Sequence, residues 1–232
     1  QMHTAHRYAK EHDALITLGL KPHRPDTGYG YIQFDETQVS PGINKVKTFT
    51  EKPPMELAEK FLESGDFLWN SGMFVWSIPS ILKALNDHLP EMNLTFSEGK
   101  GAYNTTIEAS HIERIYTEIG SISIDNGLLE KADNVYVLPS DFGWSDLGTW
   151  KSVHEKIATG EINTVLNATL HATNSSNNLV ISDSKKLIVI NDLDGYFVID
   201  TADALLICKS DQEQEVKKIS TDIKKKYGGK YS

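Results

Sequence analysis

Cysteine is almost absent from this sequence, because Cys208 is the only one among 232 residues. A single thiol excludes an internal disulfide, and its apolar setting, "ALLICK", predicts a small core residue. Long apolar runs are lacking too, since none approaches the roughly 18 residues that a membrane-spanning helix needs. The polar start "QMHTAHRYAKEHD" does not resemble a secretory signal peptide. These absences favour a cytoplasmic protein with no membrane partner.

Basic residues are also in short supply. Lys and Arg number 23 against 32 Asp and Glu, which gives a formal net charge of -9. A nucleic-acid surface needs clustered Lys and Arg to neutralise phosphates, so this balance argues against nucleic acid as a partner. Small phosphorylated ligands remain compatible, provided that a lysine or a divalent cation supplies positive charge locally.

The order of hydrophobic patterns predicts an α/β protein. Alternating and continuous apolar runs predict strands at 14–20, 29–37, 44–51, 71–76 and 134–139, and the second and third of these form an antiparallel pair. Helical spacing predicts helices at 1–13, 55–65, 79–90, 105–119, 123–133, 150–159 and 212–229.

The composition changes near Gly160. Short β-rich runs follow at intervals of about ten residues, a pattern typical of a small sheet, barrel or β-solenoid. We therefore predict two domains, 1–160 and 161–232, the second β-rich and ending in a helix.

Three polar clusters stand at the ends of predicted strands, where ligands commonly bind in α/β folds. They are "FTEKPP", with Glu51 and Lys52, "WNSGMFVW", with Asn70, and "GWSDLGTW", with Asp146. Glu51 could accept hydrogen bonds from ligand hydroxyls and Lys52 could meet a phosphate, although the pair could equally be a charged strand end. Asn70 could donate and accept at once, or simply belong to an Asn-Ser-Gly turn.

Asp146 lies between two tryptophans and two glycines. A carboxylate in that setting needs a partner, which could be a backbone donor, a basic side chain or a cation. It could hold a metal ion, and it could also cap the helix that follows. Gly30, in "TGYGY", could let the backbone approach a ligand closely.

Taken in order, the motifs resemble one family. "TGYGYI", "FTEKP", "WNSGMFVW", "SIDNGLLEKADNVYVLP" and "GWSDLGTW" are similar to the sugar nucleotidyltransferases, and within them to the mannose-1-phosphate guanylyltransferases. The resemblance covers about 15–150 and continues in 195–219. It implies the carboxy-terminal part of a Rossmann-like core, with a mixed sheet flanked by helices, and a β-helix-like domain after it.

The resemblance also implies a reaction, in which GTP and α-D-mannose 1-phosphate give GDP-mannose and diphosphate. Gly30 would approach the sugar through its backbone, Glu51 and Asn70 would hold sugar hydroxyls, and Lys52 would meet the sugar phosphate. Asp125 would line the same pocket.

The same resemblance makes Asp146 one of two aspartates that hold Mg²⁺. A metal ion and a lysine offset the charge that gathers when one phosphate attacks another. Asp146 and Lys52 are thus the expected catalytic residues.

One part of the family pattern is missing. No glycine-rich loop with a basic residue follows a strand, and the second metal aspartate is not found. We therefore expect a fragment that lacks the GTP-binding loop, keeps the sugar-phosphate contacts and turns over slowly or not at all. Strands lost from its sheet would leave an open edge, which could favour a homo-oligomer.

Two other functions remain open. The chain could serve another sugar 1-phosphate or another base, or it could be a non-catalytic module that binds sugar phosphates. A metal site at His3, His6 and His12 is not favoured, because no carboxylate or cysteine pattern completes it.

Overall fold

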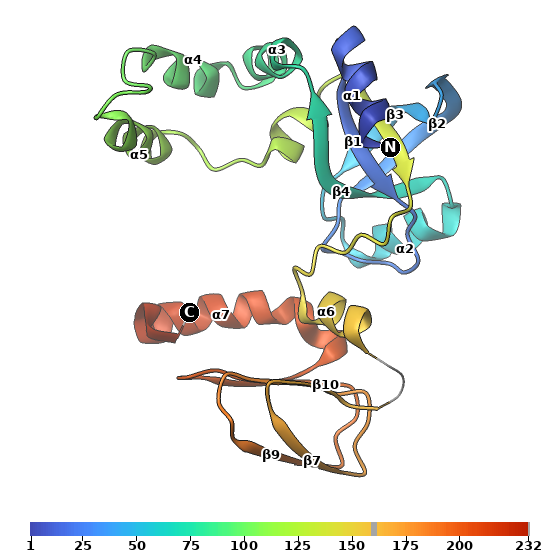
Figure 1. Ribbon diagram of the computed structural model, residues 1–232, viewed down its shortest axis with the longest axis vertical. Coiled ribbons are helices and arrows are strands. Elements are labelled where there is room, and N and C mark those ends of the chain that lie inside the picture. The colour runs from blue at the N-terminus through green and yellow to red at the C-terminus, as the bar shows by residue number, and fades with distance from the viewer. Residues whose placement is uncertain (159–161, 232) are drawn as a thin grey trace. The chain divides into compact units, whose positions relative to one another are not determined.

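The computed structural model describes residues 1–158 and 162–231 and divides into two compact units, Gln1–Trp144 and Ser145–Ser232 (Figure 1). The predicted boundary, between 160 and 161, lies outside the described residues. The boundary between the two units falls earlier in the chain, after Trp144. Helix α6 (Trp150–Ile157) belongs to the second unit, because Trp150 and Ile157 pack against the core of Leu179 and Phe197.

The first unit alternates helices and strands, as the sequence pattern predicts. Its elements are α1 (Met2–Glu11), β1 (Leu15–Leu20), β2 (Tyr31–Ser40), β3 (Ile43–Thr50), α2 (Met55–Ser64), β4 (Phe67–Trp76), α3 (Ile78–His88), α4 (Pro90–Glu98), α5 (Glu108–Glu118), a π-type turn η1 (Asp125–Leu129) and β5 (Val135–Ser140).

The five strands of this unit form a mixed sheet that closes into a barrel in the order β1-β4-β2-β3-β5. β1 and β5 are parallel, and the other neighbours are antiparallel. The mixed sheet with flanking helices is confirmed. The expected open edge is wrong, because each of these strands has a neighbour on both sides, so the sheet edge gives no reason for self-association.

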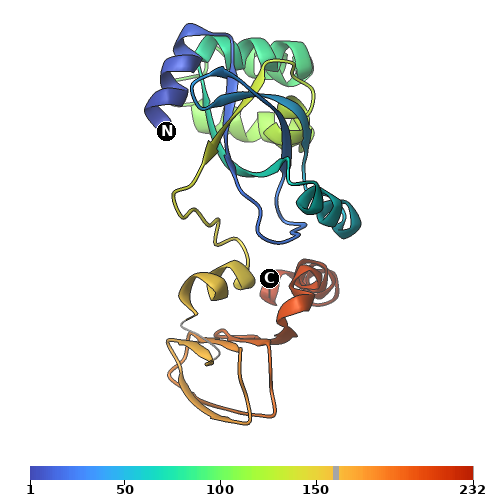
Figure 2. The same ribbon diagram turned by 90° about the vertical axis from the view of Figure 1, so that its right-hand side faces the viewer.

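Apolar side chains on both surfaces of the sheet bind the helices to it. On one surface Leu15, Ile32 and Val137 are buried with residues of α3 and η1. On the other, α1 packs through Ala5 and Ala9, and Figure 2 shows this helix lying along one side of the strands. The sheet is thus a rigid support for the residues at its strand ends.

β4 differs from its prediction in a way that matters for the site. The strand begins at Phe67, and its register against β1 shifts from Gly19↔Asn70 to Thr17↔Phe74. Gly72 takes a φ of +70° inside this bulge, a conformation that glycine adopts at little cost. The segment "NSG" is therefore a bulge within a strand and not a turn.

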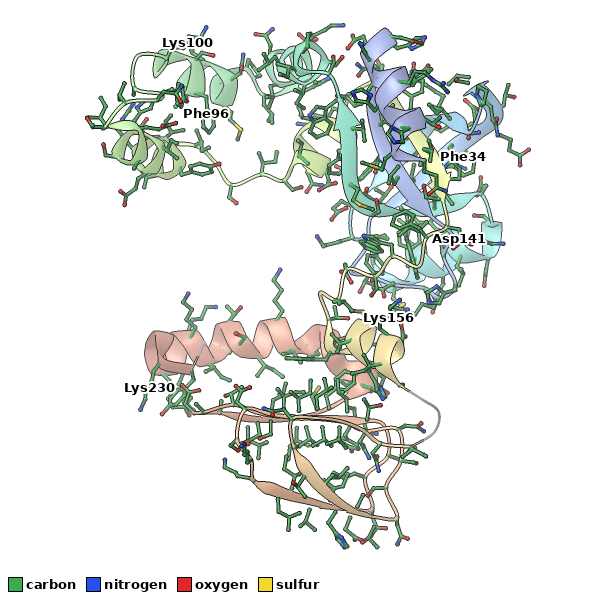
Figure 3. All side chains as sticks on the ribbon, in the orientation of Figure 1. Phe34, Phe96, Lys100, Asp141, Lys156 and Lys230 are labelled. Carbon is green, nitrogen blue, oxygen red and sulfur yellow. The ribbon has the colours of Figure 1, made fainter. Side chains whose placement is uncertain are left out.

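Helices α4 and α5 extend from the barrel in Figure 1. Phe96 of α4, labelled in Figure 3, meets the ring of Tyr116 of α5 edge-on at 5.9 Å between ring centroids. The sequence pattern predicts α5 but not α4, because the apolar residues of α4, Met92, Leu94 and Phe96, recur at every second position and not at helical spacing.

The second unit is built mainly of short strands. Its elements are α6, β6 (Thr164–Leu166), β7 (Thr169–Thr173), β8 (Leu179–Ser182), β9 (Leu187–Asn191), β10 (Tyr196–Asp200), β11 (Leu205–Lys209), η2 (Ser210–Gln212), α7 (Glu213–Tyr227) and η3 (Gly228–Tyr231).

Two parallel stacks, β6-β8-β10 and β7-β9, give this unit a β-helix-like form, as predicted. β11 turns back antiparallel to β10. Cys208, on β11, is only half-buried, so it is not the fully buried core residue that was predicted. It lies on the more buried side of this last strand with Leu206, while Leu205, Ile207 and Lys209 are exposed. No helix among the described residues combines the length and the apolar character needed to cross a bilayer.

Candidate active site

Five of the six predicted site residues lie together in the first unit. Gly30 precedes β2, Glu51 and Lys52 follow β3, Asn70 lies in the bulge of β4, and Asp125 begins η1. A chain of contacts joins all five, although the residues span almost a hundred positions of the sequence.

Gly30 and Glu51 are in close contact. A Cβ added to Gly30 would lie 2.4 Å from Glu51 Oε2 and 3.2 Å from Asn70 Cβ. Any side chain larger than hydrogen would therefore displace the Glu51 carboxylate. The backbone of Gly30 is fixed as well, because its carbonyl accepts a hydrogen bond from Asn70 N–H at 2.8 Å. Gly30 thus lets two polar side chains converge.

Glu51 carries the most unusual atom of the site. Its side chain is 11% exposed, and Oε2 is buried without a hydrogen-bond donor among the described residues. A buried carboxylate oxygen without a donor is costly. A hydroxyl brought to this position would satisfy it.

Lys52 turns back onto Glu51. Its backbone φ of 48° is left-handed, which is uncommon for a residue with a side chain. This turn lets neighbouring residues meet, and Lys52 Nζ lies 2.7 Å from Glu51 Oε1. That hydrogen bond is the main reason why the pKa of Lys52 is raised. Desolvation by burial lowers the pKa, and the negative charges of Glu51 and Asp125 raise it further. The Lys52 side chain is 61% exposed, so its ammonium group presents a positive charge at the surface.

Asn70 is held on three sides. Its Oδ1 accepts from Thr17 Oγ1 at 2.8 Å and from Gly72 N–H at 3.1 Å. Its Nδ2 donates to Asp125 Oδ1 at 3.0 Å. These partners orient the amide group, and they bring Asp125 to the same place as Glu51 and Lys52.

Two further residues support the site and were not predicted. Glu130, just after η1, accepts from Glu51 N–H at 3.0 Å, and Thr17 holds Asn70. Thr17 stands out in the sequence only as a hydroxyl within the apolar run "ALITLGL". No sequence signal marks Glu130, because its contact joins residues 79 positions apart.

The loop before Gly30 is anchored by polar contacts. Arg24 and Asp26 form an ion pair of 2.8 Å with both side chains largely buried. Asp26 Oδ1 accepts from Gly28 N–H, and Asp26 N–H donates to Tyr31 Oη. Arg24 also lies over the ring of Trp69 at 5.4 Å. These contacts fix the loop from which the segment with Gly28 and Gly30 continues into β2.

Asp146 belongs to the second unit, so its place beside the other five residues stays a prediction. It does not cap the following helix. That position is taken by Thr149, which exchanges hydrogen bonds with Ser152 in a capping box. Asp146 is exposed, and a Cβ on Gly148 would lie 2.7 Å from its Oδ2, so Gly148 leaves room for the carboxylate.

A magnesium ion fits this carboxylate only in part. Mg²⁺ usually binds one or two carboxylates together with ligand phosphates and waters. Asp146 supplies one oxygen group of that kind. Within residues 1–158 and 162–231, no group of three or more His, Cys, Asp or Glu side chains converges as a metal site. An ion at Asp146 would therefore depend on oxygen ligands from elsewhere, such as a bound phosphate.

The fold and the site define a class of protein. The family model described as nucleotidyl transferase matches residues 1–161, and the chain belongs to this family. A second model, described as the MannoseP isomerase/GMP-like beta-helix domain, matches residues 172–222. The two matches reproduce the predicted order of a core followed by a β-helix.

Particular relatives carry the comparison further. A mannose-1-phosphate guanylyltransferase of Sinorhizobium fredii (strain NBRC 101917 / NGR234) is 36% identical over 87% of this chain and 39% of its own length. Another, from Salmonella muenchen, is 32% identical over 90% of this chain and 44% of its own length.

A solved structure agrees with these relatives. The crystal structure of a mannose-1-phosphate geranyltransferase from Thermus thermophilus matches with a TM-score of 0.81 and 25% identity, over 96% of this chain and 64% of that one. The chain spans less than half the length of the curated relatives named above.

Proposed function

We propose that this chain provides the sugar-phosphate site of a mannose-1-phosphate guanylyltransferase. The observation that carries the proposal is the pairing of Glu51 and Lys52. Buried Glu51 Oε2 needs a hydroxyl donor, and the Lys52 ammonium group stands beside it, hydrogen-bonded to Oε1 at 2.7 Å. A sugar phosphate offers both a hydroxyl and an anion within one small molecule. The relatives' names supply mannose as the sugar and a guanylyl group as the part transferred.

In the proposed reaction a phosphate oxygen of mannose 1-phosphate attacks the α-phosphorus of GTP. A new phosphorus–oxygen bond forms, the bond from the α-phosphorus to the β-phosphate oxygen breaks, and diphosphate leaves. Glu51 and Asn70 hold sugar hydroxyls beside the Gly30 backbone, and Asp125 lines the pocket. Lys52 holds the attacking phosphate and offsets its charge.

Asp146 is the proposed ligand of Mg²⁺, which when bound would neutralise charge on the phosphates. The base, the sugar and a cytoplasmic location are likewise proposed for the whole protein.

Calorimetric titration with mannose 1-phosphate tests the site. Lys52→Met should weaken binding at least tenfold, because it removes the charge that meets the phosphate. Lys60→Met is the matched control, since Lys60 forms the same kind of ion pair, with Glu56 at 2.8 Å, on the exposed surface of α2.

Absence of binding by the unaltered chain, or equal binding by Lys52→Met, would refute the proposed site. Mass spectrometry of products formed with GTP and Mg²⁺ then tests the transfer. Formation of GDP-mannose would exclude the non-catalytic module, whereas binding with slow or no turnover is the result that we expect of a chain without the glycine-rich phosphate loop.

A further inference from the structure

Thr17 is buried in the middle of β1, beneath the proposed sugar site. Its exposed fraction is 0%, and its hydroxyl donates to Asn70 Oδ1 at 2.8 Å. The two residues lie 53 positions apart. A buried hydroxyl must form a hydrogen bond to offset its desolvation, and here that bond is made to the side chain of a site residue.

The bulge of β4 creates this contact. The register of β1 against β4 shifts between Thr17 and Gly19. The backbone of Asn70 still pairs with Gly19, and the shift brings its side-chain amide to the hydroxyl of Thr17. Bulges commonly re-aim a side chain next to a functional site. The N–H of Gly72, inside the bulge, donates to the same oxygen at 3.1 Å.

The three hydrogen bonds leave one direction of Asn70 open. Oδ1 accepts twice, which matches the two lone pairs of an amide oxygen. Nδ2 gives one of its two hydrogens to Asp125 Oδ1. The remaining hydrogen is the only group of the amide that these contacts leave for a ligand. Asn70 therefore acts as a donor toward a ligand. The opposite orientation of the amide, rotated by 180°, would place its NH₂ group against the Gly72 N–H and the Thr17 hydroxyl, both of which donate in the observed orientation.

We propose that Thr17 is a positioning residue, whose hydroxyl fixes the amide of Asn70 so that it offers a hydrogen-bond donor to a sugar oxygen. This inference rests on the proposed function, because it takes a sugar phosphate as the ligand. Thr17 itself does not touch the ligand and acts only through Asn70.

A double-mutant cycle tests this role. Thr17→Val keeps the shape of the side chain and removes the donor, and it should weaken binding of mannose 1-phosphate roughly three- to tenfold. Asn70→Ala should weaken binding by at least as much. The double variant should bind no worse than Asn70→Ala, because Thr17 has no effect once the amide is gone. Thr17→Ser keeps the hydroxyl and should restore most of the affinity.

The outcomes separate the two proposals. If the unaltered chain does not bind mannose 1-phosphate, the proposed function fails. If the chain binds and Thr17→Val binds equally well, or if the two losses multiply in the double variant, the positioning role is refuted. Thermal unfolding of all four variants shows whether each one folds. If Thr17→Val does not fold, the affinity of Thr17→Ser tests the role instead. Thr17→Ser should bind mannose 1-phosphate like the unaltered chain, and a loss of affinity as large as that of Asn70→Ala refutes the role.

Discussion

Replacing Gly30 by alanine tests the geometry of the site most directly. The added Cβ would lie 2.4 Å from Glu51 Oε2, whereas ordinary contact begins at 3.4 Å, so the carboxylate must move by about 1 Å. Lys52 is mostly exposed and can follow it. Asn70 Cβ, at 3.2 Å, must also give by a few tenths of an ångström. Crowding of this kind costs about 1–2 kcal/mol of stability.

The effect on binding should exceed the effect on stability. A shift of about 1 Å breaks a hydrogen bond between Oε2 and a ligand hydroxyl, because such bonds weaken steeply with distance. Hydrogen bonds to charged groups contribute about 1.5–3 kcal/mol. We therefore expect mannose 1-phosphate to bind roughly ten- to a hundredfold more weakly to Gly30→Ala.

Calorimetry and urea unfolding, applied to the same variants, measure both effects. Gly101→Ala is the matched control, since no heavy atom lies within 4 Å of its added Cβ, and it should leave binding unchanged. Gly30→Ala combined with Glu51→Ala should regain part of the lost stability, because the collision is removed, but should not regain affinity. Unchanged affinity in Gly30→Ala alone would show that Glu51 Oε2 does not meet the ligand.

Three more predictions follow from single contacts. Glu130→Ala should weaken binding of mannose 1-phosphate by roughly three- to tenfold, because the Glu51 N–H loses its acceptor. Glu130→Gln keeps an acceptor and should bind normally. Calorimetric titration of both variants checks this, and equal affinities of the two variants would contradict it. Asp200 accepts hydrogen bonds from Ser182, Ser184 and Lys186, in that order of effect, which lower its pKa from 3.8 to about 2. A lowered folded-state pKa stabilises the fold above the unfolded value, and this stabilisation is lost as the pH falls through the folded value. Urea midpoints of the unaltered chain and Asp200→Asn should therefore differ at about pH 7 and converge near pH 2, and a difference that does not vary with pH would refute the assignment. Finally, the raised pKa of Lys52 keeps its charge throughout the neutral range, so titrations between about pH 6 and pH 9 should show no loss of affinity due to this lysine.

Much of the secondary structure could be predicted because its causes are local. The alternating residues of β2 and β3, the helical spacing in α2 and the glycine that ends it all lie within a few positions of one another. Gly65 takes a φ of 77° at the end of α2, as a glycine at a helix terminus commonly does. The short β-rich runs after Gly160 likewise indicate a repetitive β structure, because each run and the turn residues that bound it lie within about ten positions.

Motifs in the sequence also predict the candidate site residues, but not their contacts. The string "FTEKPP" placed an acid and a base side by side, and only the left-handed φ of Lys52 shows that they meet. The string "WNSGMFVW" offered a turn or a ligand group, and the register of β1 against β4 made it a bulge.

The sequence by itself determined the family, the order of the elements and the residues with chemical potential, since each of these depends on neighbours along the chain. The tertiary structure alone decided that the five strands close into a barrel, that α6 joins the second unit, and that Thr17 and Glu130 support Asn70 and Glu51. Those contacts join residues 53 and 79 positions apart, and no local pattern encodes them, because a hydrogen bond depends on where the folded backbone brings its two partners.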